Sequence, residues 1–334
     1  MDIYSLIMLF VASFLGTYLY RKIAISRNIL ANINFRTLHI KPVPAGGGIV
    51  FAMVFVVGMF YQWWLFQSSN NLLLVIASGA GVAALFGFLD DLKDIRAMKK
   101  FAVQFLLSGW TLFWLDGGPL MFIDWIPSIV AIPSTIIFLV WMMNGYNFMD
   151  GIDGMAISGT VFVSGTMIWV LLLTHPESEF INMMALLLVS SSAFMLFNWP
   201  PASIFMGDAG SAFLGYLFGL LVLVTVMQGD VTIWTWLVVF SYFFADLVVT
   251  QIMRVILVKK WYLAHRSHAY QNLARITGSH LKVTGGVVLY NLIWVLPLTL
   301  WSALSPEIAL YAVVLAVFPG IIIAYRYGPR LSSS

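Results

Sequence analysis

The chain contains no cysteine among its 334 residues, which excludes both a disulfide framework and a thiolate metal site. Charged residues are also scarce, at 9% of the sequence, whereas hydrophobic residues make up 61% and the mean hydropathy is +0.94. A composition this apolar excludes an ordinary soluble domain. The basic pI of about 9.0 comes from loop residues between the apolar segments, so we expect no nucleic-acid partner.

Long apolar runs are present instead, without the alternating pattern of a membrane β-barrel. They predict an all-α fold, a polytopic bundle of about 11 transmembrane helices in one membrane domain, 1–334. A span needs roughly 17 to 25 residues. The candidate spans are 3–20, 47–67, 72–89, 101–117, 126–143, 155–174, 180–197, 210–228, 231–257, 283–303 and 307–325. No basic region precedes the first span, and Arg21 and Lys22 follow it, so we expect a retained helix and not a cleaved signal peptide.

Basic residues occur on one side of the predicted bundle only. All 17 Lys and Arg lie after odd-numbered spans or, for Arg254, at the end of the ninth span. Because Lys and Arg are enriched in cytoplasmic loops, we predict an outside N-terminus and a cytoplasmic C-terminus. The cytoplasmic loops expected to carry the active site are 21–46, 90–100, 144–154, 198–209 and 258–282.

Six acidic residues gather on the same side, at or near the ends of predicted helices. They are Asp90, Asp91, Asp94, Asp150, Asp153 and Asp208. A carboxylate near the hydrocarbon boundary is costly unless it is paired or holds a cation, and six together would repel one another. Oxygen ligands of this kind favour Mg²⁺ or Mn²⁺, held by one or two carboxylates together with substrate phosphates.

The first acidic cluster spans residues 87–94 and is followed by two lysines. Asp90 and Asp91 with Lys99 and Lys100 suit a metal-bridged diphosphate, because the metal and the ammonium groups together neutralise phosphate oxygens. An ordinary charged loop explains this cluster equally well when it is considered alone.

The second cluster is a glycine-rich segment, 144–154, with polar side chains at every third residue. A tight helical turn would align Asn144, Asn147, Asp150 and Asp153 on one face, where they could bind metal, nucleotide or sugar. The alternative is a glycine-rich helix cap.

Two further acids lie at or inside predicted spans. Asp208, between Gly207 and Gly210, begins a span where backbone N–H groups and the helix dipole favour an anion, although a simple N-cap is the alternative. Asp246 lies inside the ninth span, eight residues before Arg254, and a structural ion pair is at least as good an explanation as catalysis.

Histidines occur in two of the basic loops. His265 and His268 flank Arg266 in the most basic loop and could hydrogen-bond phosphate, or could be ordinary polar loop residues. No third nitrogen ligand lies nearby, so a zinc site is not expected. His39 precedes a flexible run that ends in Gly47 at the mouth of the second span.

These segments, in this order and on one face, resemble the polyprenyl-phosphate N-acetylhexosamine-1-phosphate transferase family. The family includes the phospho-MurNAc-pentapeptide translocases and the bacterial enzymes that start O-antigen and related glycans. The resemblance covers nearly the whole chain, and the predicted layout is more similar to the glycan-initiating branch. The segments that carry it are 42–48, 90–91, 147–154, 205–211, Asp246 with Arg254, and 265–271.

The resemblance implies transfer of a sugar-1-phosphate from a UDP-sugar to a polyprenyl phosphate in a bacterial inner membrane. The reaction would release UMP, would require Mg²⁺ or Mn²⁺, and is compatible with a homodimer. Catalytic roles are implied for Asp90, Asp91, Asp208, His265 and His268, and metal binding for Asp208 and Asp150. Substrate binding is implied for Asn144, Asn147, Asp150, Asp153, Arg266, Lys99, Lys100, His39 and Gly47. The translocases have a tighter histidine run than 265–268, which argues against a MurNAc-pentapeptide donor.

Two other interpretations remain open at this stage. Residues 90–94 also match the DDxxD pattern of prenyl-diphosphate enzymes, so an intramembrane Mg²⁺-dependent prenyltransferase that releases pyrophosphate is one alternative. A transporter is the other, but it should place ionisable groups at the bilayer midplane, where only Asp246 is expected.

Overall fold

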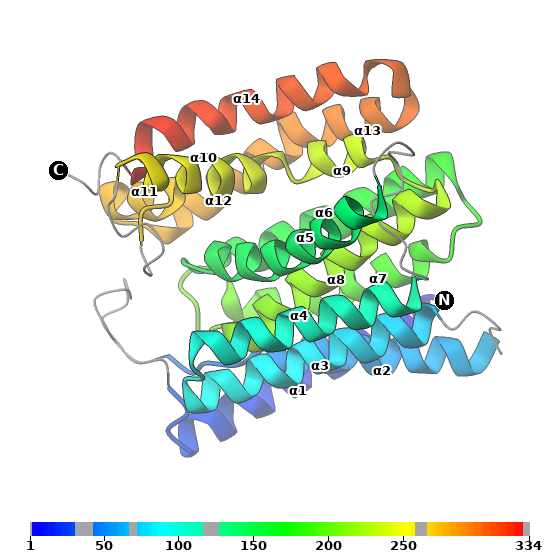
Figure 1. The fold of residues 1–334 in the computed structure, drawn as a ribbon. Coiled ribbons are helices and arrows are strands. Elements are labelled where there is room, and N and C mark those ends of the chain that lie inside the picture. Colours follow the sequence, from blue (N-terminus) through cyan, green and yellow to red (C-terminus); the bar gives the residue numbers. More distant parts are fainter. Residues whose placement is uncertain (1, 31–42, 67–71, 116–126, 258–265, 330–334) are drawn as a thin grey trace.

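The computed structural model describes residues 2–30, 43–66, 72–115, 127–257 and 266–329. Within these ranges the chain is helical apart from turns and one isolated antiparallel bridge between Leu30 and Pro44. Most of the helices run side by side in one bundle, so the predicted all-α membrane fold is confirmed (Figure 1).

The helices follow the chain in simple succession, and short helices interrupt the order only in the last third. Their bounds are α1 Ile3–Ser26, α2 Gly48–Phe66, α3 Leu72–Lys93, α4 Ala97–Trp114, α5 Ser128–Met149, α6 Met155–Thr174, α7 Phe180–Asn198, α8 Gly207–Gln228, α9 Ile233–Val239, α10 Ser241–Leu257, α11 Ala269–Thr277, α12 His280–Tyr290, α13 Leu296–Leu304 and α14 Ala309–Tyr327. A π-helical turn, Asn291–Val295, joins α12 to α13, and a 3₁₀ turn, Pro306–Ile308, precedes α14.

Helices lie at all eleven predicted spans, but not all of them qualify as spans. In the described part of the chain, nine helical segments are long and apolar enough to cross a membrane, or ten if the bent pair α9–α10 counts as one span. The two members of that pair meet at 81°. The remaining helix, α4, includes Lys99 and Lys100 within its first turn, which lowers its hydropathy. The described ranges therefore contain nine or ten candidate spans, against the prediction of about eleven.

Several helices also extend beyond the predicted ends of their apolar runs. Helix α5 continues to Met149, and α3 continues to Lys93, so Asn144, Asn147, Asp90 and Asp91 lie on helices and not in loops. Hydropathy locates where the apolar segment ends, whereas backbone hydrogen bonding continues the helix into the polar region.

Helix α8 forms the centre of the bundle. It packs mainly against α3 and α5, and most of its residues are buried. Small residues allow this close packing, as expected where helices associate in lipid through van der Waals contact. A Cβ atom on Gly48 of α2 would lie 2.4 Å from the Cα of Gly210, and one on Gly215 would lie 2.5 Å from the Cα of Met143. The positions of α2, α3 and α5 around α8 therefore depend on glycine.

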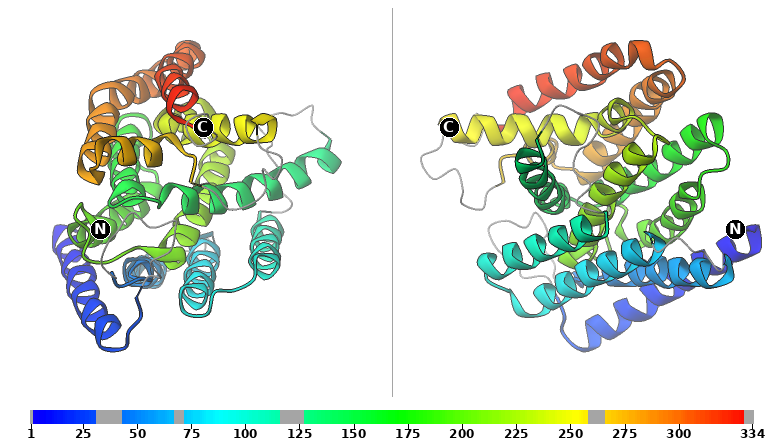
Figure 2. Two further views of the ribbon diagram at one scale, coloured as in Figure 1. Left: turned by 90° about the vertical axis from the view of Figure 1, so that its left-hand side faces the viewer. Right: turned by 45° about the vertical axis from the view of Figure 1, so that its right-hand side comes forward.

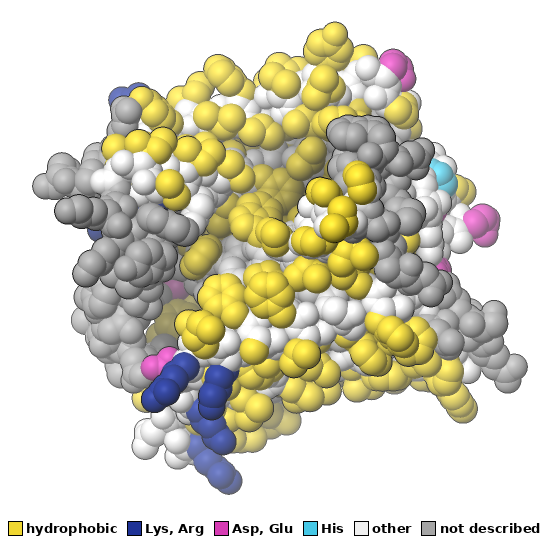
Figure 3. Space-filling view, in the orientation of Figure 1, with side chains coloured by type: hydrophobic (Ala, Val, Ile, Leu, Met, Phe, Trp, Pro, Cys, Tyr) yellow, Lys and Arg dark blue, Asp and Glu magenta, His cyan; other side chains and the backbone are white. Residues whose placement is uncertain are grey.

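Charge is segregated to the two ends of the bundle. In the space-filling view, Lys and Arg appear only at the left-hand end, and the right-hand end carries acidic residues and a histidine (Figure 3). Between them the visible face is mainly apolar. The left-hand end, which faces the viewer in the left panel of Figure 2, also holds the ends of α3, α5 and α10 and the start of α11.

Candidate active site

A lysine bridges two of the predicted acids at the basic end of the bundle. The Lys100 Nζ atom at the start of α4 lies 3.0 Å from Oδ2 of Asp208 on α8 and forms a second ion pair with Asp90 on α3. Asp90 is buried, whereas about a third of each of the Lys100 and Asp208 side chains is exposed, at 34% and 29%. Burial alone would lower the pKa of Lys100, but the Asp208 and Asp90 carboxylates more than offset this and raise it.

The two asparagines of α5 lie on the same side of this cluster. Asn147 donates from Nδ2 to Asp208 Oδ1 at 2.5 Å and to Ser211 Oγ at 3.2 Å. Asn144, one turn earlier, donates to Gln104 Oε1 on α4 at 2.8 Å. The spacing argument therefore holds for these two residues. Gln104 is a contact that the sequence motifs did not indicate, whereas Ser211 is the last residue of the 205–211 motif.

These side chains line a pocket of about 590 Å³ between α3, α4, α5 and α8. Its lining combines polar and charged side chains with apolar side chains of the same four helices. Its lining residues are Ala83, Phe86, Gly87, Asp90, Lys100, Val103, Gln104, Leu107, Met143, Asn144, Asn147, Asp208 and Ala212. A concave site with a few convergent polar groups is the usual form of a small-molecule site.

Asp91 holds the N-terminus of α8. Its two carboxylate oxygens accept hydrogen bonds from the backbone N–H groups of Asp208, at 2.8 Å, and Ala209, at 3.0 Å. Gly207 adopts φ +71°, and a Cβ atom there would lie 2.5 Å from Asp91 Oδ2. The anion site predicted at this helix start therefore exists, and a carboxylate of the protein occupies it.

Asp150 caps the C-terminal end of α5 and faces the same group of acids. Burial, followed by the charges of Asp91, Asp208 and Asp153, raises the pKa of Asp150 well above its ordinary range. The backbone N–H of Gly207 opposes this shift by hydrogen bonding to the carboxylate. Four of the six predicted acids, Asp90, Asp91, Asp150 and Asp208, therefore lie close together, and their mutual repulsion favours a cationic partner, whereas Asp94 is exposed.

No group of three or more His, Cys, Asp or Glu side chains in the described ranges is arranged to hold a metal ion. Mg²⁺ needs fewer protein ligands than this, because it is commonly bound by one or two carboxylates, with water and substrate phosphates completing its shell. Asp208 and Asp150 supply hard oxygen donors of that type near each other, so these residues fit the predicted ion.

Asp153 interacts with Ala202, His280 and Thr284, outside the lining of this pocket. Its Oδ2 accepts from the Ala202 N–H at 3.0 Å and lies 3.3 Å from His280 Nδ1, and its carbonyl accepts from Thr284 Oγ1 at 2.7 Å. The predicted alignment of Asp153 with Asn144 and Asn147 is wrong, because α5 ends at Met149 and the chain turns before Asp153. His280 was not singled out from the sequence, where nothing pairs it with Asp153.

The histidine segment contributes packing on the same end of the molecule. His268 is 2% exposed, and its ring contacts those of Phe148 and Tyr270, with centroid distances of 5.8 and 5.9 Å. Its Nδ1 atom lies 3.7 Å from Asp246 Oδ2. The Arg266 carbonyl accepts from Arg275 at 2.9 Å. The predictions for His265 and His39 fall on residues outside the described ranges.

Two other predicted binding residues have local explanations. Gly47 donates its N–H to the Phe205 carbonyl at 2.9 Å, and a Cβ atom there would lie 2.6 Å from Ile204. Close packing accounts for this glycine. Lys99 is exposed, in contrast to its neighbour Lys100.

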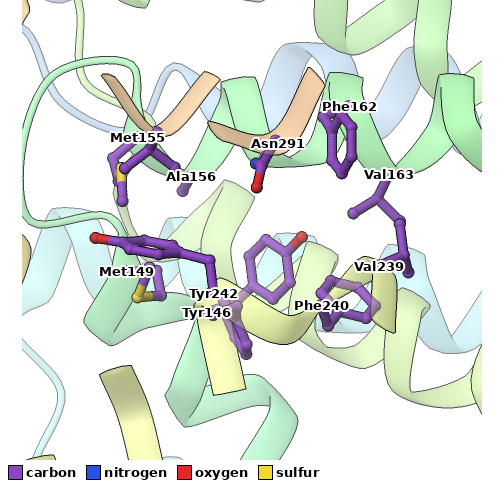
Figure 4. A pocket seen from close by; sticks show the side chains of 13 residues that line it. Tyr146, Met149, Met155, Ala156, Phe162, Val163, Val239, Phe240, Tyr242 and Asn291 are labelled. Atoms are coloured by element: carbon purple, nitrogen blue, oxygen red, sulfur yellow. The ribbon is translucent and has the colours of Figure 1, made fainter. Parts of the chain in front are cut away.

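A second cavity lies on the opposite side of α5 and differs in chemistry. It measures about 420 Å³ and is enclosed by side chains from α5, α6, α9, α10 and α12 and by Asn291, whose amide points inward (Figure 4). Its described lining contains no charged side chain. Of these two pockets, the first is the one lined by charged side chains.

The part of the chain that forms the first pocket is similar to known proteins. Residues 72–226, from α3 to α8, match the family model of glycosyl transferase family 4. The chain is 28% identical over 213 residues to a probable undecaprenyl-phosphate N-acetylglucosaminyl 1-phosphate transferase of Bacillus subtilis, covering 61% of this chain and 58% of that protein.

Two phospho-N-acetylmuramoyl-pentapeptide-transferases are similarly related. The one from Dictyoglomus thermophilum is 30% identical over 188 residues, covering 52% of this chain and 56% of the relative. The one from Thermotoga neapolitana is 31% identical over 196 residues, covering 54% and 60%. Each match spans less than two thirds of the relative's own length. The acids, amides and lysine of the pocket all lie within 72–226, whereas the segment from 266 onward lies outside the family match.

Proposed function

Because residues 72–226 match the family model of glycosyl transferase family 4, we propose that the chain transfers a sugar-1-phosphate from a UDP-sugar to a polyprenyl phosphate, releasing UMP. The sugar is an N-acetylated hexosamine or a deoxy derivative, and the product starts a cell-surface glycan such as O-antigen. The reaction takes place at the cytoplasmic face of a bacterial inner membrane; the one-sided distribution of Lys and Arg supports this orientation of the pocket.

One observation carries the proposal. Lys100 pairs with Asp90 and Asp208 in a single pocket at the basic end of a membrane bundle, and Asn147 donates a hydrogen bond to Asp208. Cationic and amide donors next to carboxylates are suited to a phosphate-bearing substrate that approaches from the membrane surface. A transporter should instead have its ionisable groups at midplane, and the Asp246 carboxylate is used for packing α11.

The chemistry requires little general-base assistance. A phosphate monoester has a second pKa near 6, so a lipid phosphate is mostly dianionic at neutral pH. An oxygen of that phosphate attacks the phosphorus attached to the sugar, a new P–O bond forms, and the bond to the UMP oxygen breaks. The main task of the protein is to bring two anions together. The positive charge of Lys100 reduces the repulsion between them, and Asn147 holds Asp208 in place by a hydrogen bond.

A divalent ion completes this proposal. Mg²⁺, or Mn²⁺ in its place, would be held by Asp208 and Asp150 and would neutralise phosphate oxygens when bound. Asp90 then keeps Lys100 in the pocket, and Asp91 fixes the start of α8 and hence the backbone of Asp208.

The test is a reconstituted reaction with purified protein, undecaprenyl phosphate, Mg²⁺ and a panel of UDP-sugars labelled at the β-phosphate. We expect label in the lipid product, UMP in solution, and reversal on adding excess UMP, since one phosphoanhydride is exchanged for another of similar energy. Release of UDP or pyrophosphate, or no lipid product with any sugar nucleotide, would contradict the proposal. Pyrophosphate released from a prenyl diphosphate would indicate the prenyltransferase instead.

A further inference from the structure

We propose that Tyr270 is a positioning residue for the active site: its hydroxyl fixes the end of α5 that carries Asn147 and Asp150, and α10 fixes Tyr270 in turn. This inference rests on the proposed function for its kinetic consequences, but its structural consequence can be measured independently. Tyr270 lies on α11, outside the segment matched by the family model.

The contact between α11 and α5 is direct. Tyr270 is fully buried, and its hydroxyl donates a hydrogen bond to the backbone carbonyl of Phe148. Carbonyls in the last turn of a helix have no partner within the helix, so an external donor decides where that turn rests. Phe148 lies between Asn147 and Asp150 in sequence, which makes the tyrosine a clamp on both.

Gly151 shows how closely the two segments approach. A Cβ atom at this position would lie 2.3 Å from the Tyr270 hydroxyl oxygen and 2.5 Å from Gln271 Nε2. Any side chain at 151 would therefore displace α11 or the residues that follow α5. The backbone next to Asp150 rests on the Tyr270 side chain over both Phe148 and Gly151.

Tyr270 is itself anchored from α10. Asp246 Oδ1, which is buried, accepts a hydrogen bond from the Ala269 N–H at 3.0 Å and another from Thr250 Oγ1 at 3.1 Å. Arg254, two turns later on α10, donates from its guanidinium to Ser267 Oγ at 3.2 Å. These bonds hold the first turn of α11 in place, and the His268 ring contacts the Phe148 and Tyr270 rings.

The protonation state of the hydroxyl suits this task. Burial, followed by the charges of Asp246 and Asp150, raises the pKa of Tyr270 well above its ordinary value. The group therefore remains a hydrogen-bond donor at any physiological pH, and it is not available as a general base. Tyr270 consequently acts through α5 and not on the substrate.

The experiment compares Tyr270→Phe with Tyr290→Phe. Tyr290 also donates its hydroxyl to a backbone carbonyl, that of Ala316 at 2.7 Å, but this bond joins α12 to α14 away from the pocket. In hydrogen–deuterium exchange, we expect peptides covering 144–154 to exchange faster in Tyr270→Phe and to be unchanged in Tyr290→Phe. This measurement needs no substrate.

Kinetics give the second measurement. In Tyr270→Phe we expect kcat/KM for the sugar nucleotide to fall by about tenfold or more, because small displacements of positioned groups reduce rates strongly. If Asp90 on α3 and Lys100 on α4 hold the lipid phosphate, its KM should change little, because the Tyr270 hydroxyl bonds to α5. Equal effects of the two variants on both substrates would overturn the proposal.

Gly151→Ala supplies a double-mutant cycle. The methyl group of alanine at 151 would displace the Tyr270 hydroxyl. Adding Gly151→Ala to Tyr270→Phe should therefore lower kcat/KM less than adding it to the wild type. Additive losses, or unchanged exchange at 144–154 in Tyr270→Phe, would remove the positioning role. If the wild-type protein shows no transferase activity but hydrogen–deuterium exchange at 144–154 is faster in Tyr270→Phe, the proposed function is wrong and the structural role of Tyr270 is supported.

Discussion

At the residue scale, the two adjacent lysines of α4 provide the sharpest contrast in the protein. Lys100 is half-enclosed between Asp90 and Asp208, whereas Lys99 is exposed. A lysine that neutralises two acids in a pocket can also hold phosphate as a compact point charge. Under the proposed function we therefore expect the charge at 100 to take part in the reaction and the charge at 99 to contribute only to membrane orientation.

Lys100→Met should lower turnover by about ten- to a hundredfold, because it removes the cation from the pocket and leaves Asp90 and Asp208 facing each other. Lys99→Met should retain nearly full activity and is the matched control. UMP release measured in parallel for the two variants checks this. Equal activities would mean that Lys100 only balances charge.

Asp208→Asn keeps the shape of the side chain and removes its charge. We expect a loss of about 3 kcal/mol or more in transition-state stabilisation, over a hundredfold in rate, with a monodisperse protein in detergent. The control is Asp230→Asn, since Asp230 accepts from Ser178 at the other end of the bundle. Near-normal turnover in Asp208→Asn, at ordinary Mg²⁺ concentrations, would mean that Asp208 has only a structural role at the start of α8.

At the element scale, the position of α3 against α8 determines how far Asp90 lies from Asp208. A Cβ atom on Gly87 of α3 would lie 2.2 Å from the carbonyl oxygen of Asp208, so the two helices touch through backbone at the level of the site. Asp91, one turn later, ties α3 to the same turn of α8. The site is therefore built on two helices in fixed register.

Gly87→Ala should push α3 and α8 apart and destabilise the protein by about 1–3 kcal/mol, as overpacking typically does, with a large loss of activity. Gly81→Ala on the same helix is the control, because its Cβ atom would meet only Val56 at 3.6 Å, an ordinary contact. Thermal unfolding in detergent and turnover should both separate the two variants. Tolerance of alanine at 87 would show that the register is not tight.

At the scale of the whole molecule, segregated charge gives the bundle a direction. The basic end holds the acidic pocket and α11, and the opposite end holds Ser178 and Asp230. Lys and Arg are retained on the cytoplasmic side, so the pocket should face the cytoplasm. Donor nucleotides would then reach it from the cell interior and the lipid from the membrane.

The absence of natural cysteine makes this orientation simple to test. Glu177→Cys and Thr277→Cys both introduce a thiol at an exposed position, one at each end. In intact cells an impermeant thiol reagent should label Cys at 177 and not Cys at 277, and both should react after lysis. Ser267, although it is in the basic loop, is unsuitable because it is buried. The reverse labelling pattern would overturn the cytoplasmic site.

The sequence by itself determined the class of protein and most of the site's composition. Apolar runs force a helical bundle because backbone groups in lipid must be satisfied within each segment. Local spacing was enough to bring Asn144 and Asn147 to one face, because both lie on a single continuous helix. The acids Asp90, Asp150 and Asp208 were identified because carboxylates at a membrane boundary are costly.

Only the tertiary structure decided how these residues are used. It distinguished Lys100 from Lys99, turned Asp153 toward His280, and made Asp91 the partner of α8 amides 117 and 118 residues away. It also placed His268 in a buried stack and showed Tyr270 holding the end of α5. Contacts between segments distant in sequence depend on helix packing and on where each helix ends, and neither follows from hydropathy or from the spacing within a motif.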